Sequence, residues 1–167
     1  MTLVEMLVSI ALGAVVLTAF AQMLFYAGLS FAPMSNYTDL DYGSNHALKV
    51  MSREIRQANL VQGVTSTNLT LVDYDTLPLE YSWSSGAKTL SRTKNGQTEV
   101  LLRDCESVNF ALFTRNPMNG AFDYYPVSTN PTPAKLVQVS WVCRRRVLGT
   151  AVNTLSELSA KFVLRNQ

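Results

Sequence analysis

The fold is decided by one apolar stretch near the start of the chain. Residues 6–29 read MLVSIALGAVVLTAFAQMLFYAGL and contain no Asp, Glu, Lys or Arg. About 20 apolar residues are enough to cross the ~30 Å hydrocarbon core of a bilayer. A single segment in hydrocarbon must be helical, because the helix satisfies each backbone N–H and C=O internally. We therefore expect a hydrophobic helical stem over residues 1–32, immersed in lipid or packed among copies of itself.

The stem does not read as a secretory signal peptide. Such a leader has a basic start, an apolar core of about 7–15 residues and a cleavage site of small residues. No basic residue precedes this apolar run, and the run is longer than a leader core. We expect the stem to be retained in the mature protein.

One carboxylate, Glu5, stands at the start of the stem. A carboxylate in a membrane helix costs roughly 2.5–3.5 kcal/mol, although the dipole of the first helical turn favours an anion. In a bundle of such helices, the cation within reach is the α-amino group of a neighbouring chain. A glutamate that reaches the lipid headgroups from an anchored helix is the alternative interpretation.

Beyond Pro33 the helical pattern becomes amphipathic. Small and apolar residues recur at intervals of three and four, and basic residues mark another face at Lys49, Arg53 and Arg56. This pattern predicts an amphipathic helix over about 39–60, packed on a globular domain that covers 33–167. Because proline has no backbone N–H, we expect Pro33 to kink or interrupt the helix.

Short strands are predicted over about 67–165. The segments are rich in β-branched and aromatic residues and are separated by turn signals, of which Asn95-Gly96 is the strongest. A meander of this kind makes the sheet antiparallel, with the last strand beside the one before it. The expected fold class is α+β: a long N-terminal helix with a C-terminal antiparallel sheet. The predicted strands are 68–73, 79–83, 89–92, 99–102, 107–113, 136–143 and 159–165.

Two irregular features flank the strongest strand. Residues 115–133 read as a long loop, which is typical of a functional or variable surface. Its aromatic residues form a candidate surface patch or cap the sheet edge; they are Phe122, Tyr124 and Tyr125. Arg144, Arg145 and Arg146 are interpreted as a solvated edge that resists aggregation.

The two cysteines allow two interpretations. Cys105 and Cys143 form a disulfide if this part of the chain faces an oxidising compartment. Otherwise they are small buried hydrophobic residues. A zinc site is not expected, because there is no CxxC motif and His46 is the only histidine.

The sequence contains no recognisable catalytic motif. We find no nucleophile elbow, P-loop, dinucleotide turn or HExxH, so we expect neither an enzyme nor a cofactor. With 14 Lys+Arg against 12 Asp+Glu, the net charge of +2 gives no reason to expect a specific nucleic-acid partner.

The N-terminal segment resembles a known family. Thr2-Leu3-Val4-Glu5-Met6-Leu7-Val8, followed by Ser9-Ile10-Ala11-Leu12-Gly13, is similar to the mature N-terminus of type IV pilins and of type II secretion pseudopilins. That family has glutamate at the fifth mature position, and the motif covers about the first 30 residues. Two positions depart from it: Met1 stands where Phe is usual, and Gln22 stands where type IV pilins commonly have proline. More weakly, the globular part resembles the larger minor pilins and J-type pseudopilins.

The resemblance implies a filament subunit. A prepilin peptidase would remove a short leader before Met1, and its α-amine would be N-methylated. The stem would anchor the subunit in the bacterial inner membrane and later pack in the filament core through an assembly machinery. There Glu5 would pair with the amine of the next copy, and Leu3, Leu7 and Gly13 would contact neighbouring helices.

We therefore expect a structural subunit of a type IV pilus-like extracellular filament, with copies of itself as partners. One alternative is a minor pseudopilin at the tip of a periplasmic pseudopilus. The other is a monomeric membrane-anchored domain that binds a partner through the 115–133 loop.

Overall fold

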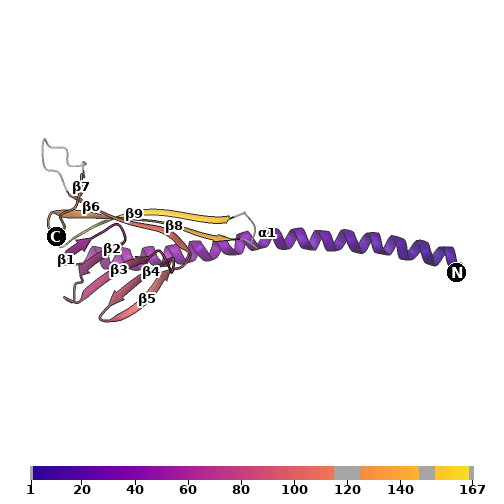
Figure 1. Cartoon of the computed structure of the whole chain (residues 1–167), viewed down its shortest axis with the longest axis horizontal. Coiled ribbons are helices and arrows are strands. Elements are labelled where there is room, and N and C mark those ends of the chain that lie inside the picture. The colour runs from indigo at the N-terminus through magenta and orange to yellow at the C-terminus, as the bar shows by residue number, and fades with distance from the viewer. Residues whose placement is uncertain (1, 115–124, 147–152, 166–167) are drawn as a thin grey trace.

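The computed structural model describes residues 2–114, 125–146 and 153–165, which form one helix and two antiparallel sheets. Figure 1 shows the N-terminal half of α1 projecting as a stem, whereas its C-terminal half lies along the strands. This is the predicted α+β fold with a long N-terminal helix. The elements are α1 (Leu3–Gln57), β1 (Leu60–Val64), β2 (Asn68–Val72), β3 (Pro78–Ser84), β4 (Thr89–Lys94), β5 (Gln97–Leu102), β6 (Cys105–Thr114), β7 (Val127–Ser128), β8 (Ala134–Arg146) and β9 (Asn153–Val163).

Helix α1 is one continuous element of 55 residues, about 82 Å long at 1.5 Å per residue. It runs through Pro33 without a break, so the expected interruption there is wrong. A proline removes one intrahelical hydrogen bond, whereas a break would leave up to four unsatisfied groups on each side of it. The amphipathic half buries one face at the predicted spacing; its buried residues are Leu40, Ser44, Ala47, Met51 and Ile55.

The strands divide into two sheets rather than one. The first is a meander in the order β1-β2-β3-β4-β5, and the second has the order β7-β6-β8-β9. The Asn95-Gly96 hairpin joins β4 to β5, and both residues have positive φ, 51° and 74°, as a type I′ turn requires. Strand β9 returns beside β8 as predicted.

Sequence patterns missed two strands and the division into sheets. Strand β1 contains Gly63 and a register shift before it, which weaken the alternating signal. Strand β7 has only two residues. After β5 the chain turns at Asp104, whose φ is 59°, and β6 then pairs with β8 instead of continuing the meander.

The hydrophobic core lies where both sheets meet the C-terminal half of α1. Its largest fully buried side chains are Trp141 of β8, Tyr81 of β3 and Met51 and Ile55 of α1. The helix and both sheets contribute side chains to this core. The amphipathic half of the helix is therefore a structural part of the globular domain. The stem contributes nothing to this core.

Candidate assembly surface

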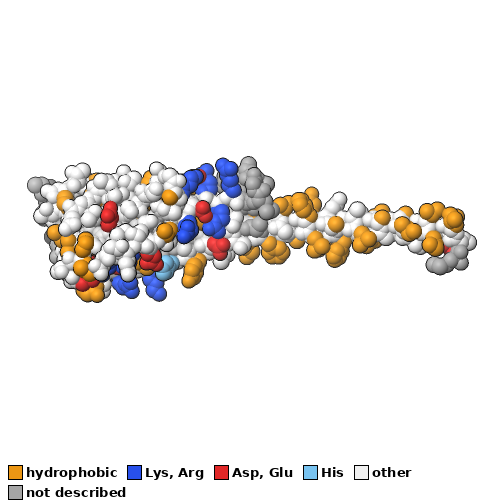
Figure 2. All heavy atoms as spheres, turned by 60° about the horizontal axis from the view of Figure 1, so that its bottom comes forward, with side chains coloured by type: hydrophobic (Ala, Val, Ile, Leu, Met, Phe, Trp, Pro, Cys, Tyr) orange, Lys and Arg blue, Asp and Glu red, His pale blue; other side chains and the backbone are white. Residues whose placement is uncertain are grey.

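The stem exposes large apolar side chains all along its length, and Figure 2 shows them on the face in view. From Leu3 to Tyr26, each large apolar side chain is more than half exposed, the lowest values being 53% for Met6 and Val8. Soluble monomers rarely expose apolar patches beyond a few hundred Å². Within the described residues, α1 is the helix that is long and apolar enough to span a membrane. This surface therefore requires lipid or other protein to cover it.

The first turn of α1 is closed by a capping box. The Thr2 N–H donates to Glu5 Oε2 at 2.7 Å, and the Glu5 N–H donates to Thr2 Oγ1 at 3.3 Å. The pair satisfies two backbone donors that a helix start otherwise leaves open. Glu5 thus has a role within its own helix, which the sequence analysis did not consider.

The residues predicted for assembly lie on the bare stem where the structure describes them. Leu3 and Leu7 are one turn apart on the same face, and both are exposed. Apart from Gly13, its chain neighbours and the adjoining backbone of its own helix, no atom lies within 4 Å of the position that a Cβ on Gly13 would take, so another helix has room to approach there. Met1, Phe122 and Tyr124 lie outside the described residues, and Tyr125 is partly exposed.

Helix α1 is joined to the second sheet by a buried hydrogen bond. Trp141 Nε1 of β8 donates to Ser44 Oγ at 3.2 Å, and both residues are almost completely buried. Leaving a buried donor without its acceptor costs about 1–3 kcal/mol, so this bond sets the position of the helix on β8.

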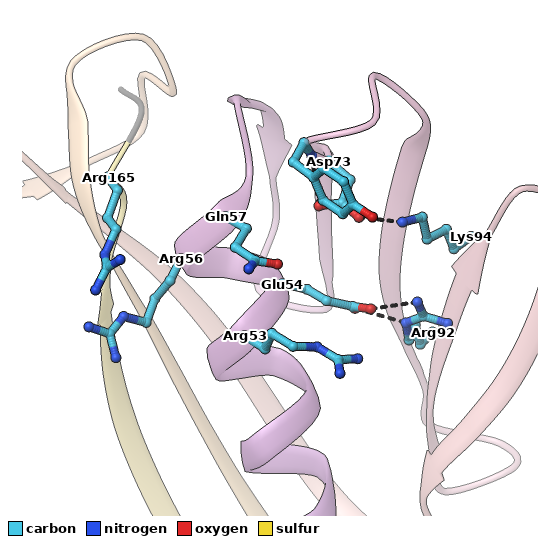
Figure 3. A pocket seen from close by; sticks show the side chains of 9 residues that line it. Arg53, Glu54, Arg56, Gln57, Asp73, Arg92, Lys94 and Arg165 are labelled. Carbon is cyan, nitrogen blue, oxygen red and sulfur yellow. Dashed lines mark hydrogen bonds and ion pairs between the residues drawn. The ribbon is translucent and has the colours of Figure 1, made fainter.

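Helix α1 is joined to the first sheet through Glu54, which is only 5% exposed. Its carboxylate accepts from Tyr81 Oη at 2.5 Å and from Arg92 Nε and Nη2 at 2.8 and 2.5 Å (Figure 3). The hydrogen bond to Glu54 raises the pKa of the Arg92 guanidinium. Burial, and then the negative charge of Glu54, raise the pKa of Tyr81. The buried Glu54 and Tyr81 and the partly exposed Arg92 therefore satisfy one another's hydrogen bonds.

The sequence analysis missed this network, although a signal was present. Glu54 follows Met51 by three residues and precedes Ile55, so it falls on the face of the helix that the apolar spacing marks as buried. A carboxylate on such a face requires a partner. The partner itself could not be named, because Arg92 is 38 residues away.

A second ion cluster closes the turn between β2 and β3. Lys94 Nζ of β4 contacts Asp73 and lies 2.7 Å from Asp75 Oδ2. Hydrogen bonds to Asp73 and then to Asp75 raise the pKa of Lys94, and the bond from Lys94 lowers the pKa of Asp75. The side chain of Asp73 is almost completely buried, so Lys94 balances a charge inside the domain.

The arginines at the end of β8 do not form a simple solvated edge. Strand β8 lies between β6 and β9 and is not an edge strand of its sheet. Arg145 bridges Asp39 of α1 at 3.2 Å and Asp104 at 3.0 Å, so it links the helix to the turn between the two sheets. Arg144 also lies 3.4 Å from Glu106, so two of the three arginines at the strand end have acidic partners.

A disulfide joins Cys105 of β6 to Cys143 of β8, and the two residues are partners in the strand ladder. Both cysteines are buried. The described parts of the globular domain are thus held to α1 by Ser44, Glu54 and Asp39, and internally by the disulfide.

Comparison of the chain with protein-family models, with curated proteins and with solved structures finds no match.

Proposed function

We propose that this chain is a structural subunit of a type IV pilus-like filament, and that it polymerises through the stem of α1. The observation that carries the proposal is the bare apolar half of α1. A single membrane anchor needs about 20 apolar residues, and lipid alone could cover this one. The resemblance of residues 2–13 to type IV pilins and pseudopilins adds assembly to anchoring.

Burial of the stem supplies ample free energy for assembly. Moving one large apolar side chain out of water contributes about 2 kcal/mol, and the stem carries many such side chains. Lipid covers them before assembly, and the helices of neighbouring copies cover them in the filament core. Small residues along the stem, such as Gly13, allow those helices to approach closely.

Glu5 provides specificity that apolar packing lacks. Apolar stems can slide past one another with little change in buried area, whereas a carboxylate in a dry bundle needs a partner at one position. The α-amine at the start of a neighbouring copy is a cation that can supply this partner. We infer that this pair sets the axial register between subunits.

The compartment follows from the same proposal. The stem lies in the bacterial inner membrane before assembly, and the globular domain lies on its oxidising side, where the Cys105–Cys143 disulfide persists. A prepilin peptidase and an assembly machinery are the partners at that stage. The assembled filament is extracellular.

The test compares Glu5→Gln with Glu5→Ala in cells that carry the assembly machinery. Glutamine keeps an oxygen that can accept from the Thr2 N–H, but it has no charge. We expect both variants to reach the membrane and neither to form filaments, measured by electron microscopy of sheared filaments and by membrane fractionation. Ser9→Ala serves as the control and should assemble. It removes a hydroxyl that donates to the backbone carbonyl of Glu5 in the same helix, and it leaves the Glu5 side chain in place.

The outcomes separate the alternatives. If Glu5→Gln assembles normally and Glu5→Ala does not, Glu5 acts as a helix cap and the proposed register role fails. If filaments contain a single copy of this chain, located at the tip, the chain is a minor pseudopilin. A chain that stays monomeric in the membrane with wild-type Glu5 contradicts the filament proposal and leaves an anchored domain.

A further inference from the structure

A basic pocket lies where the C-terminal end of α1 meets β2, β4 and the residues after β9 (Figure 3). Its volume is about 690 Å³. Five cationic and two anionic side chains line it, so positive charge exceeds negative charge by three. Its lining residues are Arg53, Glu54, Arg56, Gln57, Asp73, Tyr74, Arg92, Lys94 and Arg165.

Both carboxylates of the pocket are already paired. Glu54 holds Arg92, and Asp73 holds Lys94. The remaining cations are Arg53, Arg56 and Arg165, which form no ion pair or hydrogen bond through their side chains with any residue in the described ranges. All three are exposed. The pocket therefore has an inner wall of neutralised pairs and a mouth of three uncompensated arginines.

Arg56 and Arg165 are brought to the same hollow only in the folded chain. Arg53 and Arg56 are on α1, whereas Arg165 follows β9, and the three also line a second, smaller hollow of about 290 Å³ beside the first. Figure 3 shows the guanidinium groups of Arg56 and Arg165 close together. The dipole at the helix end favours Arg56, but it does not account for Arg165, which lies outside any helix. Like charges held together without a counter-charge repel each other.

We propose that this basic pocket binds a phosphate group. The planar guanidinium fork matches the oxygens of carboxylate and phosphate in a bidentate manner. Figure 3 shows that Arg53 extends toward the β4 side of α1, so the two forks that can face one ligand are those of Arg56 and Arg165. A phosphate has more oxygens than a carboxylate and carries up to two negative charges at neutral pH, which balances the two neighbouring guanidinium groups of Arg56 and Arg165.

The phosphate does not come from the membrane that holds the stem. Along α1, Leu29 at the end of the apolar run and Arg53 in the pocket are about 36 Å apart at 1.5 Å per residue. The headgroup layer on each side of a bilayer is only about 5–8 Å thick. The pocket thus lies beyond these headgroups, and its ligand is free phosphate or a phosphate ester outside that membrane.

The test is calorimetric titration of the full chain, in nonionic detergent, with inorganic phosphate at constant ionic strength balanced by chloride. We expect one saturable site. The Arg56→Gln, Arg165→Gln double variant should bind roughly tenfold more weakly, which corresponds to about 1.4 kcal/mol. The control is Arg103→Gln, Arg146→Gln, which removes the same charge from two exposed arginines outside the pocket and should bind as the wild type does.

Further measurements separate a site from general charge. Arg56→Lys, Arg165→Lys keeps the charge but loses the fork, so its affinity should fall between those of the wild type and the glutamine variant. Glycerol phosphate replaces inorganic phosphate in a parallel titration; tighter binding of the ester points to an esterified source, and weaker binding points to free phosphate. Thermal unfolding checks that each variant is folded, and Arg165→Gln alone repeats the test if the double variant is not.

The proposal is overturned if phosphate shows no saturable binding beyond that of chloride. It is also overturned if the control variant loses as much affinity as the pocket variant. Glu5→Gln should bind phosphate normally, because the pocket lies at the opposite end of α1. A failure of this inference is therefore distinguishable from a failure of the proposed filament.

Discussion

At the scale of the residue, Glu54 is a buried charge that joins α1 to the first sheet. It is buried in the contact between α1 and the first sheet, where Tyr81 and Arg92 donate to it. A buried ion pair contributes little compared with apolar packing, but breaking it leaves a charge without a partner. Glu54 therefore specifies where the helix lies on the sheet more than it adds stability.

We predict that Glu54→Ala destabilises the domain by about 3 kcal/mol, the lower end of the range for breaking buried pairs. The lower end applies because Arg92 is partly exposed and also lies 3.8 Å from Glu99. Urea unfolding of the full chain in detergent, followed by tryptophan fluorescence, measures the change. Glu99→Ala is the matched control on the same arginine and should change stability by less than about 0.5 kcal/mol. Equal effects from the two variants would contradict the assignment.

At the scale of the element, the disulfide connects two strands that are already paired. Cys105 and Cys143 are ladder partners on β6 and β8 and are 38 residues apart in sequence. The enclosed segment includes residues 115–124, which the structure does not describe, and the short strand β7. The bond fixes the register of β6 against β8 at the Cys105–Cys143 pair.

We expect the Cys105→Ala, Cys143→Ala double variant to lose about 4 kcal/mol of stability, because closing a loop of this length restricts the unfolded chain by that amount. Thermal unfolding with and without dithiothreitol measures the effect. The reductant should destabilise the wild type similarly and leave the double variant unchanged. If the reductant lowers the melting temperature of the double variant, it acts elsewhere and the prediction fails.

At the scale of the whole molecule, α1 belongs to two different environments. Its C-terminal half is buried against the sheets from Leu40 to Ile55. Its N-terminal half contributes no residue to the buried core and exposes large apolar side chains along its length, as the face in Figure 2 shows. The molecule thus combines a packed small domain with a long exposed apolar surface, of a kind that soluble monomers rarely carry.

We predict that removal of residues 1–29 yields a domain that stays soluble and monomeric without detergent and keeps its near-UV circular dichroism. The removed residues contribute nothing to the buried core, and their exposed apolar surface is what makes detergent necessary. Sedimentation velocity measures the oligomeric state. Removal of residues 1–43 is the comparison: it also deletes Leu40 and the Asp39 partner of Arg145, so its melting temperature should be lower. Aggregation of the first truncation would show that the stem supports the fold.

The sequence by itself determined the features that local patterns encode. The uncharged run of 6–29 required a helix, the spacing from Leu40 to Ile55 marked the buried face, and Asn95-Gly96 required a hairpin. These signals come from side-chain periodicity and turn sterics, which act between neighbours in the chain. The resemblance around Glu5 added the proposal of a filament.

Only the tertiary structure decided how distant segments meet. The strands divide into two sheets because β6 pairs with β8 and not with β5. No pattern of neighbouring residues in the sequence predicts that pairing. Helix α1 continues through Pro33 because a break would leave more backbone groups unsatisfied than the proline does. Glu54 binds Arg92 across 38 residues of sequence, and Arg56 and Arg165 line the same hollow although they are far apart in the chain. Both the buried ion pair and the basic pocket therefore exist only in the folded chain.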